Sequence, residues 1–109
     1  MIVLLALPGC DPAFELRGRV TSTDGKGLAQ AEALVSCNGE AYVHTLSSAD
    51  GRFFAPRIGG CSNDCEVVVR ALGYEPYRAP VRSHCTKPGG ASTMCATVKL
   101  EVKLPRTVP

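Results

Sequence analysis

The chain has 109 residues, which is room for a single domain. Its formal net charge is only +2 and its Lys and Arg residues form no run, so a concentrated basic face for nucleic-acid binding is not expected. Trp is absent, and the eleven Gly and eight Pro are spread along the chain, which favours short elements joined by turns over long helices.

The N-terminal segment has the character of a secretory signal sequence. Residues 1–10 read MIVLLALPGC, and their uncharged apolar run is far shorter than the about 20 residues that cross a bilayer. The closing LPGC resembles the lipobox of bacterial lipoproteins, where cleavage leaves a lipid-modified cysteine as the first residue. The resemblance implies that residues 1–10 are the remnant of a signal peptide and that lipid on Cys10 anchors the protein to a membrane. The alternative is a buried first strand with Cys10 in a disulfide.

The first half of the remaining chain shows the alternation of strands and no helical periodicity. Residues 15–21 alternate apolar with charged or polar side chains, because successive side chains of a strand point to opposite faces. An Asp-Gly or Asn-Gly pair follows each of the first three strands, and glycine favours such turns because it tolerates positive φ. These strands are expected at residues 15–21, 31–37, 41–47 and 52–55, the last ending before Pro56.

Three further strands are expected in the second half. Residues 65–72 contain three consecutive valines, and a strand that is apolar on both faces indicates a central position in a sheet. Pro80 places the strand at residues 77–83 at an edge or makes it irregular. The last strand, at residues 96–104, alternates Val and Leu with polar residues, and residues 105–109 are expected to be a frayed tail.

Polar stretches at residues 59–64 and 86–93 are expected to be loops. Seven short strands separated by regular turns predict an all-β protein, a seven-stranded antiparallel β-sandwich.

Four stretches form a series: LRGRV from residue 16 with DG after it, SSADGRF from residue 47, VVVRALGY from residue 67 and VKLEVKL from residue 98. In this order they resemble the carboxypeptidase regulatory-like domain over residues 14–104. The resemblance implies a transthyretin-like sandwich without catalytic residues of its own. The family occurs beside zinc carboxypeptidases, at the start of outer-membrane receptors, and alone in secreted proteins and lipoproteins.

Six cysteines are a high density for this length and favour an oxidising compartment outside the cytoplasm. A transthyretin-like fold would bring five of them to one pole, because its second, fifth and sixth strands are neighbours. We expect a disulfide between Cys85 and Cys95, and a second from Cys37 to Cys65 or Cys61. No metal or other cofactor is expected. The alternative is a metal-binding or small enzymatic domain that uses the Cys and His side chains of this pole.

The sequence lacks the motifs of three enzymes with a similar topology. His44 does not begin the His-x-x-Glu pair of zinc carboxypeptidases, and neither the His-x-His pair of intradiol dioxygenases nor the final Tyr-Arg-Gly-Ser of hydroxyisourate hydrolases occurs. Ser83 and His84 are neighbours on an expected strand and would point to opposite faces, which does not suit a nucleophile and its base. We therefore expect a protein that is not an enzyme.

Several side chains remain as candidates for binding. His44 and Tyr42 are expected as an exposed or partly buried cross-strand pair, and Tyr74 as a corner aromatic that packs the end of the sandwich. Five arginines are expected on a solvated sheet face, with an anion site as the alternative: Arg17, Arg19, Arg70, Arg78 and Arg82. The expected function is a binding or structural role in the cell envelope, membrane-anchored or secreted, with a protein or glycan as partner.

Overall fold

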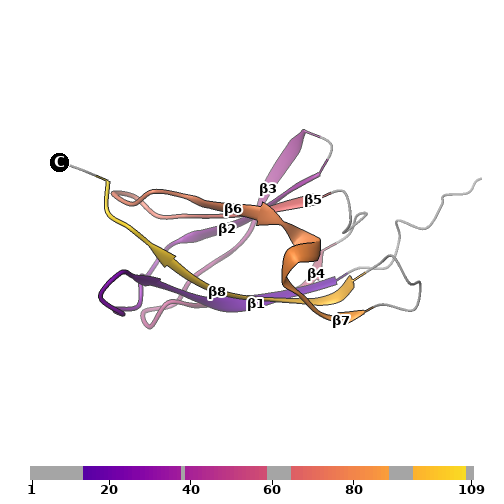
Figure 1. Ribbon diagram of the computed structural model, residues 1–109, viewed down its shortest axis with the longest axis horizontal. Helices are drawn as coiled ribbons and strands as arrows, with labels where there is room; N and C mark the ends of the chain where they lie inside the picture. The colour runs from indigo at the N-terminus through magenta and orange to yellow at the C-terminus, as the bar shows by residue number, and fades with distance from the viewer. Residues whose placement is uncertain (1–13, 38, 59–64, 89–94, 108–109) are drawn as a thin grey trace, which may run out of the picture.

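The computed structural model describes residues 14–37, 39–58, 65–88 and 95–107, which fold as an all-β protein (Figure 1). The strands are β1 (Phe14–Ser22), β2 (Glu32–Cys37), β3 (Glu40–Leu46), β4 (Arg52–Ile58), β5 (Cys65–Arg70), β6 (Tyr77–Pro80), β7 (Cys85–Pro88) and β8 (Cys95–Leu104). A short 3-10 helix, η2 (Val81–His84), joins β6 to β7. No helix among the described residues is long and apolar enough to cross a membrane.

The strands form two packed sheets. Sheet A has the order β4-β1-β8-β7 and sheet B the order β3-β2-β5-β6, and Figure 1 shows the two layers one above the other. β2 and β5 are antiparallel neighbours, and β5 is a central strand, as its three valines predict. β6, which contains Pro80, lies at an edge. A proline is tolerated there because an edge strand has backbone groups without a ladder partner.

The core lies between the sheets and is built by the alternation visible in the sequence. In sheet A, Leu16 and Val20 of β1 and five residues of β8 point inward and are buried. In sheet B, Val67 and Val69 of β5 do the same, whereas Val68 lies on the opposite, outer face. Burying one such side chain contributes about 1.5–3 kcal/mol, so this alternation is the main source of stability.

The expected count of seven strands was wrong for the described residues, which form eight. The additional strand, β7, lies in the stretch expected to be a polar loop, and it pairs with the start of β8. It has only four residues and an irregular register. Such a short strand shows no periodicity in the sequence, and its position is set by its neighbour instead.

The expectation of a purely antiparallel sandwich was also wrong. β1 and β8 pair in parallel over eight positions, from Glu15 opposite Thr97 to Ser22 opposite Leu104. Parallel neighbours need a long crossover, and here the whole intervening chain provides it. Alternation of apolar and polar residues indicates which face a side chain occupies, but it carries no information on strand direction.

Two strand boundaries differ from expectation by three residues, and the segment after β8 differs as well. β4 continues through Pro56 to Ile58, because β4 is an edge strand of sheet A. The chain turns into η2 after Pro80 instead of continuing β6. Residues 105–107 were expected to fray, yet Glu75 N–H donates to the carbonyl of Pro105 (2.8 Å) and Thr107 N–H to that of Gly73 (3.0 Å).

Candidate functional site

Two disulfides lie at one end of the sandwich, called here the disulfide pole. Cys37 of β2 bonds to its register partner Cys65 of β5, with a Cα–Cα distance of 4.4 Å. Cys85 of β7 bonds to Cys95 of β8, with a Cα–Cα distance of 5.8 Å. Every cysteine within the described residues is therefore bonded. Each disulfide joins two strands of the same sheet, so neither links sheet A to sheet B.

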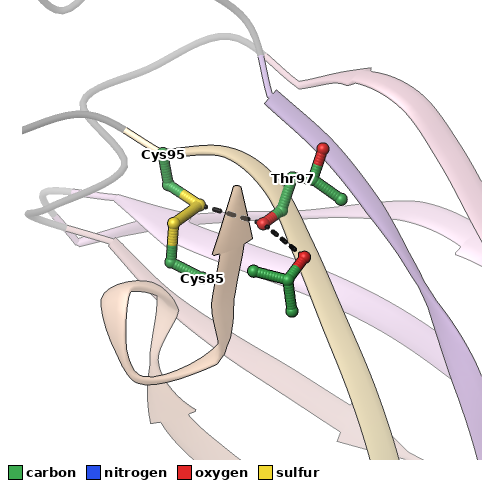
Figure 2. The surroundings of a disulfide bond; sticks show 4 residues. Cys85, Cys95 and Thr97 are labelled. Carbon is green, nitrogen blue, oxygen red and sulfur yellow. Dashed lines mark hydrogen bonds between the residues drawn. A yellow bond between two sulfur atoms is a disulfide. The ribbon is translucent and has the colours of Figure 1, made fainter. Parts of the chain in front are cut away.

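Figure 2 shows the surroundings of the disulfide in sheet A. The sulfur of Cys95 lies 3.0 Å from the carbonyl oxygen of Thr97, and the hydroxyl of Thr86 donates to the same oxygen at 3.4 Å. The first of these is a close contact and not a hydrogen bond, because a disulfide sulfur carries no proton. β7 is thus held to β8 by covalent and polar contacts in addition to its short ladder.

The alternative of a metal site at this pole conflicts with the bonding of its described cysteines. A cysteine ligates metal as a thiolate, and all four cysteines described here are bonded to one another. No group of three or more His, Cys, Asp or Glu residues in the described segments could hold a metal ion. Cys10 and Cys61 lie outside these segments. Lipid on Cys10 stays a prediction, whereas the alternative bond from Cys37 to Cys61 is wrong, because Cys37 is bonded to Cys65.

The histidines lie apart from one another. His44 is exposed on β3 at a β-bulge, which interrupts the alternation expected to pair it with Tyr42. Partial loss of hydration around the imidazole lowers the pKa of His44. His84 ends η2, so it and Ser83 do not lie on a strand as expected. Its Nε2 shares a hydrogen bond of 2.6 Å with the hydroxyl of Tyr77.

Tyr74 packs against the core at the end opposite the disulfide pole, which fits the expected corner aromatic. The guanidinium of Arg106 lies over its ring, 5.6 Å from the centroid. The two residues also form an isolated antiparallel bridge. Tyr74 therefore serves to attach the segment after β8 to the sandwich.

The five arginines do not share one face. On the outer face of sheet B, Arg70 bonds to Glu32 at 2.6 Å and Arg78 to Glu66 at 2.8 Å. Glu32 and Arg70 are direct register partners of β2 and β5. Arg82 lies separately on η2. The arginines of sheet B are thus neutralised by carboxylates of the same sheet.

The outer face of sheet A is arranged differently. Register places Phe54, Arg17 and Lys99 in one row across β4, β1 and β8. A second row contains Arg52, Arg19 and Glu101. These six residues line an open groove of about 610 Å³, to which Leu46 of β3 adds an apolar side chain. We call it the sheet A groove.

Neighbouring groups orient the arginines of the sheet A groove. Arg17 pairs with Glu15 at 2.6 Å, and its guanidinium lies 5.0 Å from the centroid of the Phe54 ring. Arg19 donates from Nε to the carbonyl oxygen of Asp50 at 2.9 Å.

Asp50 also holds the third arginine of the groove. Its carboxylate pairs with Arg52 at 3.2 Å. A hydrogen bond from the Ser48 hydroxyl, followed by one from the backbone N–H of Arg52, keeps the pKa of the Asp50 carboxyl below its usual value. The turn between β3 and β4 is therefore charged at neutral pH and orients the arginines beside it.

Two cations of the groove have no carboxylate partner among the described residues. Across the described segments, neither Arg19 nor Lys99 forms an ion pair, although Glu101 stands opposite Arg19 in the register. The groove can therefore offer N–H donors and positive charge to an anion.

Sequence reasoning considered Arg17 and Arg19 but missed their partners in the groove: Phe54, Arg52 and Lys99. Alternation could have placed these residues on outer faces, but only the register brings the three strands together. In comparisons with known proteins, neither a family model nor a curated protein matches the chain.

Proposed function

We propose that this chain is a non-catalytic β-sandwich that works outside the cytoplasm as a binding or structural module of the cell envelope. The observation that carries the proposal is the pair of disulfides at one pole. Such bonds persist in oxidising compartments and are rare in the reducing cytosol, so they are consistent with an extracytoplasmic location.

We assign the module to the carboxypeptidase regulatory-like, transthyretin-like type. The motif series of the sequence supports this assignment. The sheet order supports it as well, because β5 lies between β2 and β6, the neighbours that this arrangement requires. The eighth strand and the parallel β1–β8 pair depart from the seven-stranded antiparallel form we had expected.

The proposed tether is a lipid on Cys10, with a secreted form as the alternative. The test is expression of the gene, with its natural upstream sequence, in a bacterial host fed radioactive palmitate. The wild-type chain is expected to carry label in the membrane fraction, and Cys10→Ala to lose the label. Cys37→Ala with Cys65→Ala serves as the control and is expected to keep it. An unlabelled wild-type chain would remove the tether from the proposal.

The absence of metal chemistry is tested on protein purified from an oxidising compartment. We expect no stoichiometric zinc or iron by elemental analysis, and no more than about one free thiol per chain, because the cysteines pair. Stoichiometric metal together with several free thiols would instead support the metal-binding or enzymatic alternative at the Cys/His pole.

A further inference from the structure

The outer face of sheet A places like charges directly opposite each other. Arg17 of β1 stands opposite Lys99 of β8, and Arg19 of β1 stands opposite Arg52 of β4. Directly opposed like charges destabilise a sheet, whereas opposed unlike charges stabilise it. Sheet B uses the second arrangement, with Arg70 opposite Glu32. On sheet A, Glu15 and Asp50 pair with Arg17 and Arg52, so Arg19 and Lys99 are the groove cations that no ion pair balances among the described residues.

We infer that the sheet A groove binds an anionic glycan, a chain of sugars that carries carboxylate or phosphate groups. This inference rests on the proposed role as an extracytoplasmic binding module and names the ligand class for it. An anion placed between two opposed cations converts their repulsion into two attractive contacts. The groove holds two such pairs, Arg17 with Lys99 and Arg19 with Arg52.

The register also indicates the spacing of the anionic groups. Neighbouring strands lie about 4.8 Å apart, and side chains two residues apart on one face of a strand are separated by about 7 Å. Each pair of cations can therefore take one anionic group. The two groups lie on opposite sides of β1, so they are offset by about 7 Å along it and about 4.8 Å across it, a separation of about 8 Å. The contacts to Asp50 hold Arg19 and Arg52 in place, and each guanidinium keeps further N–H donors for the ligand.

The apolar part of the groove distinguishes a sugar chain from a denser polyanion. Phe54 and Leu46 line the groove and are 47% and 48% exposed, so they present an apolar surface beside the cations. A sugar ring has an apolar C–H face that can lie against them while its anionic substituent reaches the cations.

The acidic groups at the groove argue against nucleic acid. Glu101 lines the groove, and Glu15 and Asp50 border it. A phosphate backbone carries closely spaced charges and is bound by surfaces with a large excess of cations. A glycan with widely spaced anionic groups can avoid these carboxylates.

The test measures binding to the oxidised full chain by titration calorimetry at low salt. The probes are an oligogalacturonate, which carries carboxylates, and a phosphomannan oligosaccharide, which carries phosphates. We expect at least one of them to bind and to bind more weakly as salt is added. The assay needs no lipid anchor. If neither glycan binds, the glycan assignment is overturned and the test of the tether is unaffected.

A set of variants tests whether the site lies on sheet A. Arg19→Gln with Lys99→Gln is expected to weaken binding about tenfold or more, since each loses a charge-assisted hydrogen bond. The matched control, Arg70→Gln with Arg78→Gln, removes the same net charge from sheet B and is expected to bind more than about threefold tighter than the sheet A variant. Phe54→Ala is expected to weaken binding without any change in charge.

Three results would overturn the inference. The first is that neither glycan binds the wild-type chain. The second is that the sheet A and sheet B double variants lose affinity equally, which would indicate only net charge. The third is that polyglutamate, an acidic peptide without sugar rings, binds as tightly as the glycans. Thermal unfolding of each variant checks that the fold is retained, and Phe54→Ala keeps the test informative if the double variant unfolds.

Discussion

The outer faces of the two sheets differ in how fully carboxylates balance their cations. On sheet B, each outward arginine has a carboxylate within hydrogen-bonding distance, Arg70 with Glu32 and Arg78 with Glu66. On sheet A, Glu15 and Asp50 pair with Arg17 and Arg52, but Arg19 and Lys99 have no ion-pair partner among the described residues. Sheet B is thus arranged for stability, while sheet A retains charge on Arg19 and Lys99 that a ligand can use.

The largest expected effect comes from the disulfides, one in each sheet. The bond of sheet B separates its cysteines by 28 residues and that of sheet A by 10. In the chain-entropy model, removing them costs about 3.6 and about 2.7 kcal/mol of unfolding free energy, respectively. Urea unfolding of Cys37→Ser/Cys65→Ser and of Cys85→Ser/Cys95→Ser measures both. A larger loss of unfolding free energy for the sheet A variant than for the sheet B variant would contradict this prediction.

The second-largest effect is expected at the turn that leads from sheet B to sheet A. Ser47 is buried, and its hydroxyl donates to the carbonyl of Leu28 (2.5 Å) and accepts from the N–H of Ala31 (2.8 Å). Ser47→Ala leaves both groups without this partner and is expected to cost about 1–3 kcal/mol. Ser48→Ala is the matched control, because Ser48 is exposed and bonds to Asp50. Equal losses in chemical denaturation would show that Ser47 has no special role.

A third prediction separates the two faces by the sign of the effect. Glu32→Gln removes a surface ion pair of sheet B and is expected to lower the unfolding free energy by about 0.3–1 kcal/mol. Lys99→Gln removes a charge that stands opposite Arg17 and is expected to leave stability unchanged or to raise it by a few tenths of a kcal/mol. The two variants are compared by thermal unfolding at low salt, and a loss of equal size in both would abolish the distinction.

The smallest effect concerns pH. The pKa of Asp50 lies below its ordinary value of 3.8, chiefly because the Ser48 hydroxyl donates to the carboxylate. A lowered folded pKa means that the stabilisation is complete above the unfolded pKa and is lost as pH falls through the folded pKa. Asp50→Asn should therefore melt slightly below wild type at about pH 7 and together with it at about pH 2. A difference in melting temperature between the two proteins that grows as the pH falls would contradict this prediction.

Much of the scaffold could be predicted from the sequence. The valines of β5 indicated a central strand, and Pro80 indicated an edge. These features are readable because burial and backbone hydrogen bonding act on individual residues. Spacing alone left Cys37 with two candidate partners, and the bond to Cys65 follows from the β2–β5 register.

The candidate site could not be predicted in the same way. Arg17 and Arg70 look alike in the sequence, since each is an arginine at an outward position of a strand. Their difference lies in what stands opposite, Lys99 in one case and Glu32 in the other. That depends on strand order and direction, and the parallel pairing of β1 with β8 leaves no trace in alternation.

The most direct test of the central claim is a map of ligand contacts by NMR. Oligogalacturonate and the phosphomannan oligosaccharide are each titrated into the oxidised, 15N-labelled chain, and the amide shifts are followed. We predict that the perturbed amides cluster on β1, β4 and β8 around Arg19 and Lys99, while those of β2 and β5 stay in place. Perturbations centred on sheet B, or none with either ligand, would contradict the claim that sheet A carries the binding face.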